Sequence, residues 1–196
     1  MFNFLKLKPF AMPSPPPPTY TAQLSARDVA LLQQALTRRV PSELALAILD
    51  LAEAWQCTTA TRTERVALAQ EDEARGAYVA VAIGNPRKLR RVVVRTRSHD
   101  QGWSNDAHLY RGTYEASWTW WEAGVRGRAD VAPKELHRNL HAVREAAEHV
   151  VAWDVGQEPW LRSLREHDVV EVFARARFPG WVHYVEWCVV EVFYAW

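Results

Sequence analysis

Apolar and polar side chains alternate along several short segments, and this pattern constrains the fold most strongly. Residues 113–120, TYEASWTW, place Tyr114, Ala116, Trp118 and Trp120 on one side of an extended chain. A period of two is typical of a strand with one buried face. Further strands are predicted over 77–83, 89–98, 170–178 and 182–196. About seven or eight such strands with turns between them predict a mainly β fold, an antiparallel β-sandwich or jelly roll.

Two regions of this pattern need a choice. In the last segment, the expected inward face consists of Val185, Trp187, Val189 and Phe193. Residues 133–154 fit either a helix or two strands. Their histidines recur at a spacing of four, and the alanines favour a helix. We predict two strands joined by residues 143–148, because 136–142 and 149–154 each alternate and both flanks are rich in strands.

The chain divides into three predicted parts: a proline-rich tail over 1–20, a helical segment over 21–62 and a β-sandwich domain over 63–196. Prolines prevent the tail from forming a helix or a central strand. This composition favours a spacer over a ligand for an SH3-type partner.

Two helices are expected in the helical segment. Ser25 can cap the first, with Asp28 in its first turn and Leu24 and Val29 flanking its start as a hydrophobic staple. Pro41 suits the start of the second. One face of this second helix carries Leu44, Ile48, Leu51 and Trp55. We expect that face to pack on the sandwich, because an amphipathic helix usually serves a core.

Composition narrows the classes of partner and compartment. The formal net charge is +1, so no overall field attracts nucleic acid or an anionic membrane, and neither partner is expected. A basic stretch over 87–97 is interpreted as the solvated face of a strand. The two cysteines, Cys57 and Cys188, lie far apart in the sequence and do not form a zinc motif. The chain also has no apolar run of membrane-spanning length, so we expect a cytoplasmic or nuclear protein. We expect no cofactor.

Several motifs together resemble a known module. SHDQGWS, GTYEASWTWWEAGV, RNLHA, HVVAW and ARARFPGWVHYVE follow one another in the chain. They are similar to segments that recur in this order in uncharacterised fungal proteins. The resemblance covers roughly residues 38–196. It implies an all-β body preceded by a short helix, and it carries no function to transfer.

The second helix also resembles the first part of an F-box. Val40, Pro41, Glu43, Leu44, Ile48 and Leu49 match the opening pattern of that motif. The resemblance implies an adaptor that recruits ubiquitin machinery. The residues after Trp55 depart from the F-box, because they do not provide its second and third apolar helices. A helix that packs on the sandwich is therefore the favoured interpretation.

Tryptophans are unusually frequent, with ten in 196 residues. Trp103, Trp121 and Trp181 lie beside turns or off the apolar phase of their strands, so they are the candidates for an exposed ligand-binding surface. Trp118, Trp120 and Trp187 are assigned to the core. Since tryptophan is amphipathic, the first three could instead close the edge of the core.

Polar residues accompany these tryptophans in the same loops. His99, Asp100, Asp106 and His108 are candidate ligand-binding side chains, with the alternative that they only stabilise turns. A metal-dependent enzyme that uses His99, Asp100, His137 and His141 is a weaker alternative, because the pair His137 and His141 has neither the glutamate nor the spacing of an H-E-x-x-H motif. The sequence has no nucleophile motif, which argues against an enzyme.

These observations favour a non-enzymatic binding module. Its ligand, a protein or a small molecule such as a carbohydrate, should contact the loops around residues 99–112 and 178–184. The alternatives are the F-box-like adaptor, a lectin-like carbohydrate-binding domain and a metal-dependent enzyme.

Overall fold

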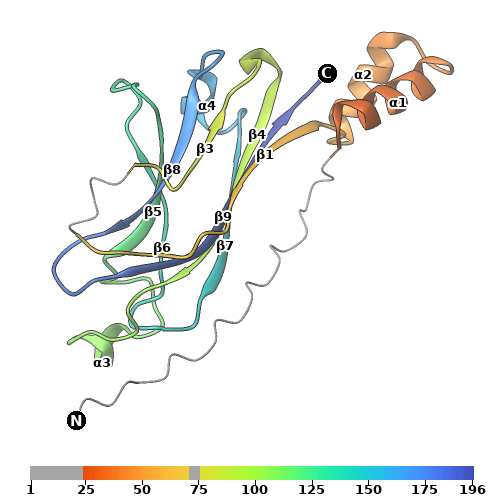
Figure 1. Ribbon diagram of the computed structural model, residues 1–196. Helices are drawn as coiled ribbons and strands as arrows, with labels where there is room; N and C mark the ends of the chain where they lie inside the picture. The colour runs from red at the N-terminus through yellow and green to blue at the C-terminus, as the bar shows by residue number, and fades with distance from the viewer. Residues whose placement is uncertain (1–23, 71–75) are drawn as a thin grey trace.

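Two antiparallel sheets pack face to face in the computed structural model, which describes residues 24–70 and 76–196 (Figure 1). The predicted mainly β fold is confirmed, and it is consistent with a β-sandwich. The proline-rich tail predicted over 1–20 lies outside the described residues. The sandwich begins at residue 56 and not near residue 63, because residues 56–62 form a strand at the edge of the first sheet.

The first sheet has the order β1-β9-β4-β7, and the short strand β2 pairs with β9 next to β1. Its strands are β1 (Gln56–Arg62), β2 (Val66–Leu68), β4 (Leu89–His99), β7 (Ala147–Asp154) and β9 (His183–Tyr194). β4 and β9 are the long central pair. Their register shifts between Arg97 and Ser98, so Arg97 faces Trp187 while Ser98 faces Val185. This bulge puts Val185 and Trp187 on opposite faces, and the single face predicted for the last strand is wrong.

The second sheet has the order β3-β8-β5-β6. Its strands are β3 (Val79–Ala82), β5 (Thr119–Val125), β6 (Lys134–Arg138) and β8 (Val169–Ala176). The choice of two strands within 133–154 is confirmed by β6 and β7. The strand predicted over 113–120 is wrong: Gly112 and Ala116 have positive φ angles of 78° and 51°, so the chain turns there and extends only from Thr119.

The core lies between the two sheets and is continuous. It includes Val92, Val94, Val190 and Val192 from the first sheet and Trp121, Ala123, Val170 and Val172 from the second. At about 25 cal/mol per Å² of apolar area removed from water, burial of these faces supplies the main stabilisation.

Two helices, α1 (Ala26–Thr37) and α2 (Ser42–Leu51), form a helical pair beyond one end of the sandwich (Figure 1). The predicted cap of α1 is confirmed, because Ser25 and Asp28 form a capping box. Arg90 at the start of β4 donates to Asp50 over 2.9 Å, and this ion pair helps to fix the pair on the sandwich. In the part of the chain that the structure describes, no helix has the length and apolar character needed to cross a membrane.

The face of α2 that should pack on the sandwich is mostly exposed. Ala45 and Leu49 are buried instead, while Leu44, Ile48 and Leu51 are 55%, 43% and 87% exposed. Only Trp55, which follows the helix, packs as expected, against Val93 and Phe193. The prediction for this face is therefore wrong, because the chain turns into β1 before α2 can lie across the sheet.

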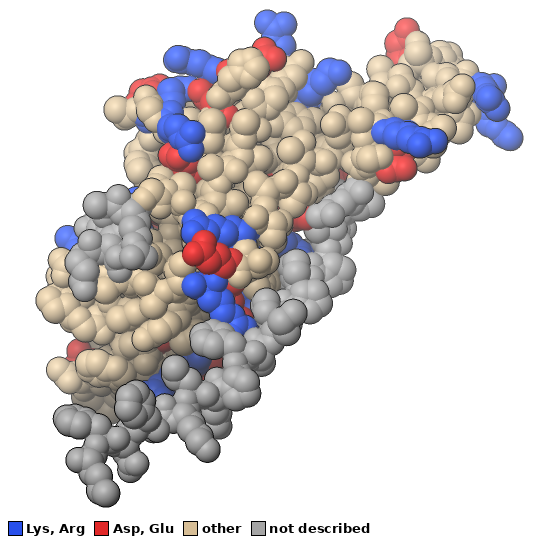
Figure 2. Space-filling view, viewed as in Figure 1, with Lys and Arg blue, Asp and Glu red and all other residues tan. Residues whose placement is uncertain are grey.

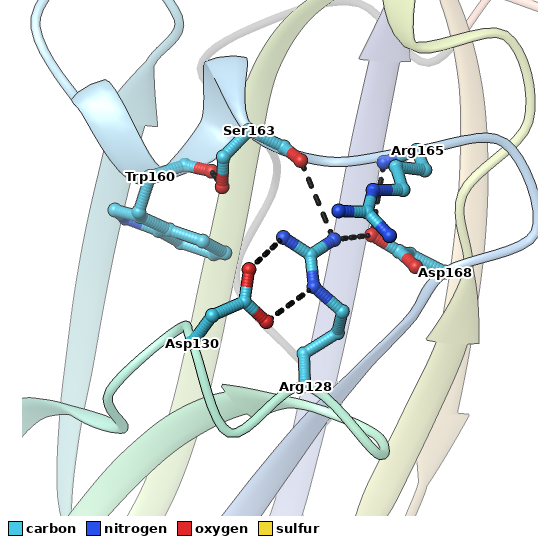
Figure 3. A network of polar contacts seen from close by, with 6 residues as sticks. All are labelled: Arg128, Asp130, Trp160, Ser163, Arg165 and Asp168. Carbon is cyan, nitrogen blue, oxygen red and sulfur yellow. Dashed lines mark hydrogen bonds and ion pairs between the residues drawn. The ribbon is translucent and has the colours of Figure 1, made fainter.

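A polar network joins two loops at the same end of the sandwich as the helical pair (Figure 3). Arg128, after β5, donates to Asp130 over 2.7 Å and to Asp168 over 2.8 Å. Asp168, before β8, also accepts the backbone N–H of Arg165 over 2.9 Å. Arg128 thereby ties the β5–β6 loop to the segment between β8 and the short helix α4 (Pro159–Arg162).

Candidate functional site

A groove lies at the opposite end of the sandwich, where β4 ends and β9 begins. It is lined by His99, Gln101, Trp103, Arg144, Gly180, Val182 and Tyr184, and we call it the strand-end groove. Its volume is about 550 Å³, within the usual range for small-molecule sites. The lining residues come from the two predicted loop regions, 99–112 and 178–184, and from one further loop between β6 and β7.

Asp100 holds two of these loops together from inside the protein. Its fully buried carboxylate accepts the backbone N–H groups of Gly102, Ala142 and Val143 over 2.7, 2.6 and 3.1 Å. Burial raises the pKa of this carboxyl, and the three N–H donors oppose that rise. Asp100 is buried and is not among the groove-lining residues, so it shapes the groove and does not line it.

Gln101 connects the same loop to the segment before β9. Its Nε2 donates to the carbonyl of Trp103 over 2.6 Å, and its Oε1 accepts the backbone N–H of Val182 over 3.1 Å. Both ends of the amide are therefore committed to backbone groups. Gln101 fixes the distance between the two walls of the groove.

Aromatic rings form these walls. Trp103 is 54% exposed, which makes it the most exposed described tryptophan, and its ring lies close to Gly180. On the other side, His99 stacks on Tyr184 with ring centres 5.0 Å apart and an interplanar angle of 8°. The groove thus offers flat apolar faces beside the exposed Arg144 side chain.

Glycine is required at position 102 for a steric reason. Gly102 has a φ of 81°, and a Cβ there would lie only 1.9 Å from Cγ of Arg144. The alkyl chain of Arg144 therefore lies directly on the Gly102 backbone. Any larger residue at this position would displace Arg144 from the rim of the groove.

Trp121 does not reach the groove, which corrects its assignment as an exposed candidate. It is fully buried, because pairing of β5 with β8 turns its side chain into the core. Its indole N–H donates to Oγ of Ser98 over 2.9 Å, and Ser98 donates to Asn139 over 2.7 Å. This buried network lies next to the groove in sequence and links the two sheets.

Trp181 supports the groove from behind without lining it. It is half-buried and packs edge-on against His141, with ring centres 5.3 Å apart. Nε2 of His141 lies 2.5 Å from Oγ of Ser104, one residue after Trp103. These contacts connect the loop that carries Trp103 to the β6–β7 loop.

Asp106 and His108 lie outside the groove. Asp106 precedes the short helix α3 (Ala107–Tyr110), His108 belongs to it, and both are exposed. Of the four predicted polar ligand-binding residues, only His99 lines the groove.

The residues of the predicted metal site serve different contacts. Asp100 accepts backbone N–H groups, His141 contacts Ser104, and His137 lies 2.7 Å from Oγ1 of Thr96. Within residues 24–70 and 76–196, no three His, Cys, Asp or Glu side chains are grouped closely enough to hold a metal.

Arg144 is the groove residue that lies outside both predicted loop regions, while Val182 and Tyr184 lie within 178–184 but were not predicted individually. Arg144 comes from a connection that was interpreted only as a link between two strands. Tyr184 follows the FPGW turn, so its place beside that turn was the only available signal. The pairing of His99 with Tyr184 across β4 and β9 decides its position, and sequence alone does not give that register.

Comparisons with known proteins do not assign this groove. No protein-family model matches the chain, and no curated protein matches it. The similarity to a fungal module therefore stays a prediction.

Replacing Asp100 with alanine is expected to lower the free energy of unfolding by about 3 kcal/mol, because one buried and two partly buried N–H groups would lose their acceptor. Urea unfolding followed by tryptophan fluorescence measures this loss. Asp106→Ala is the matched control, since it removes an exposed carboxylate from the same loop region and should change stability by less than about 0.5 kcal/mol. Equal effects of the two substitutions would contradict the role assigned to Asp100.

Proposed function

We propose that this chain is a non-enzymatic binding module whose strand-end groove takes a small ligand with a flat apolar face and polar edges, such as a sugar ring. The exposed indole of Trp103 over a groove with fixed walls carries this proposal. Trp103 and Tyr184 are both exposed in the same groove, and apolar side chains that gather in one recess mark binding sites more often than isolated ones do. An indole beside hydrogen-bonding groups suits a ring whose face is apolar and whose rim carries hydroxyl groups.

The rigidity of the groove further supports binding. Asp100 and Gln101 fix the loop backbone, and the His99–Tyr184 stack fixes one wall. A preformed site loses little conformational entropy when a ligand binds. On the face that Figure 2 shows, both signs of charge are scattered, whereas a nucleic-acid surface would gather Lys and Arg on one face.

The test is a screen of monosaccharides and oligosaccharides by calorimetry and by NMR of the indole N–H signals. We expect binding to shift the Trp103 signal and to be lost in Trp103→Ala, while urea unfolding of this variant stays close to that of the wild type. Tyr114→Ala is the control, because it removes another exposed ring that does not line the groove. Binding that survives Trp103→Ala, or a screen without any binding, would overturn the proposal.

The exposed face of α2 favours a second function, recruitment of a protein partner. Leu44, Ile48 and Leu51 project away from the sandwich, as an adaptor-binding helix requires. Two of them, Leu44 and Ile48, also match the F-box pattern. The pair differs from an F-box in that β1 follows α2 directly, so the partner would contact two helices and not three.

Binding to the purified adaptor subunit that recognises F-box helices tests this second function. The double substitution Leu44→Ser with Ile48→Ser is expected to abolish retention of the adaptor. Leu109→Ser on α3 is the control, because it removes an equally exposed leucine at the other end of the protein. Unchanged retention by the double variant would dispose of this function.

A further inference from the structure

The strand-end groove carries a positive charge at its rim that its structure does not neutralise. Arg144 is exposed, and it makes no ion pair with any residue that the structure describes. None of the groove-lining residues is acidic. Asp100, a carboxylate of the loop that begins at the end of β4, is fully buried and accepts three backbone N–H groups. The groove therefore favours an anionic group over a neutral or cationic one.

The position of this charge is fixed by the fold. The Arg144 alkyl chain lies on Gly102, where a Cβ would approach its Cγ, Nε and Cδ to 1.9, 2.8 and 2.9 Å. The backbone next to Arg144 is held as well, because Val143 donates to Asp100 over 3.1 Å. An arginine held along its stem loses less side-chain entropy on binding than a free surface arginine. Such a held position is more typical of an arginine that recognises a ligand than of one that only aids solubility.

We propose that the ligand of the groove is a sugar with an anionic group, a carboxylate or a phosphate, which pairs with the Arg144 guanidinium while the ring lies against Trp103. This inference rests on the proposed function. Arginine suits both anions because its planar N–H donors match two oxygens at once. Trp103 and Arg144 both line the groove, and the Arg144 stem lies on Gly102, which directly precedes Trp103, so we expect one ligand of monosaccharide size to contact both.

Matched sugars test the charge preference on the full chain. Calorimetry compares glucose with glucuronic acid, galactose with galacturonic acid, and glucose with glucose 6-phosphate. We expect at least one anionic sugar to bind about tenfold more tightly than its neutral counterpart, as hydrogen bonds to charged groups contribute. Added salt should weaken the binding of the anionic sugar and leave the binding of the neutral sugar unchanged. The two anionic arms separate a carboxylate ligand from a phosphate ligand.

Arg144→Gln should remove this preference and leave the neutral sugars unchanged. Arg87→Gln is the matched control, because it removes the same charge just before β4, roughly 30 Å from the groove at the usual rise per strand residue. Equal binding of neutral and anionic sugars, or a preference that survives Arg144→Gln, would overturn this inference and leave the proposed function standing. No binding of any of these sugars at millimolar concentration would overturn both.

Discussion

Lowering the pH from 7 to 5 is expected to reduce the free energy of unfolding by about 4 kcal/mol, because two enclosed histidines are uncharged in the folded protein. Burial lowers the pKa of His183 to about 3 and that of His137 to about 4, from 6.5 in the unfolded chain. His149, stacked on His137 with ring centres 4.0 Å apart, lowers the pKa of His137 further. The unfolded chain therefore binds more protons below pH 6.5. The contribution of the uncharged histidines to the free energy of unfolding is fully present above pH 6.5. It is lost as the pH falls toward the pKa values of the histidines in the folded protein.

Urea unfolding at several pH values between 7 and 5 measures this dependence. This pH window lies above the range in which most carboxylates titrate, so the histidines account for most of the change in unfolding free energy across it. His137→Gln should reduce the pH-dependent loss by somewhat less than half, since His183 and His149, whose pKa values burial also lowers, remain. His108→Gln, which changes an exposed histidine on α3, should leave the slope unchanged. Constant stability across the window would contradict the uncharged state assigned to these histidines.

Replacing Trp121 with alanine is expected to cost about 4 kcal/mol of unfolding free energy, as is usual for the loss of a large buried aromatic side chain. The indole packs edge-on against Tyr78 and His183, with ring centres 5.6 and 5.2 Å away. Its removal would leave a cavity between the sheets and would take a donor from the Ser98 hydroxyl. Chemical denaturation of the wild type and the variant measures the difference.

Trp103→Ala is the matched control for this substitution. It removes the same side chain from an exposed position, so we expect a loss of less than about 1 kcal/mol. If Trp121→Ala does not fold, Trp121→Phe retains one ring and should give a smaller, measurable loss. Similar losses for the Trp103 and Trp121 alanine variants would contradict the burial that separates these two tryptophans.

Features that depend on neighbouring residues were predictable from the sequence. The capping box of Ser25 and Asp28 is local, and it forms as expected. The strands over 77–83 and 89–98 were found because alternation and a turn signal at Gly84 agree. The two strands within 133–154 followed from their strand-rich flanks, although local spacing also allowed a helix.

Features that depend on pairing between distant segments were not predictable. The alternation in residues 113–120 gives no sign that the backbone turns at Ala116, so it put Trp121 on the wrong face. A single bulge in the β4–β9 pairing changes the face of every later residue in the strand. For α2, periodicity identified the apolar stripe correctly but could not indicate whether the sandwich would cover it.

The candidate site also combines features that the local sequence predicts with features that depend on distant contacts. The loops that carry His99 and Trp103 were identified because polar residues, glycine and tryptophan occur together in one short segment. Arg144 was missed, because its place in the groove depends on contacts between Asp100 and a loop about forty residues later in the chain. Hydrogen bonds from backbone N–H groups leave no residue pattern at the donating positions.

β4 and β9 run side by side from the helical pair to the strand-end groove, so the two candidate surfaces lie roughly 30 Å apart at the usual rise per strand residue. A sugar and a protein bound there would not touch each other. Each could be held or released without the other having to leave. Under the two proposals above, one molecule would hold a sugar at one end and a protein partner at the other.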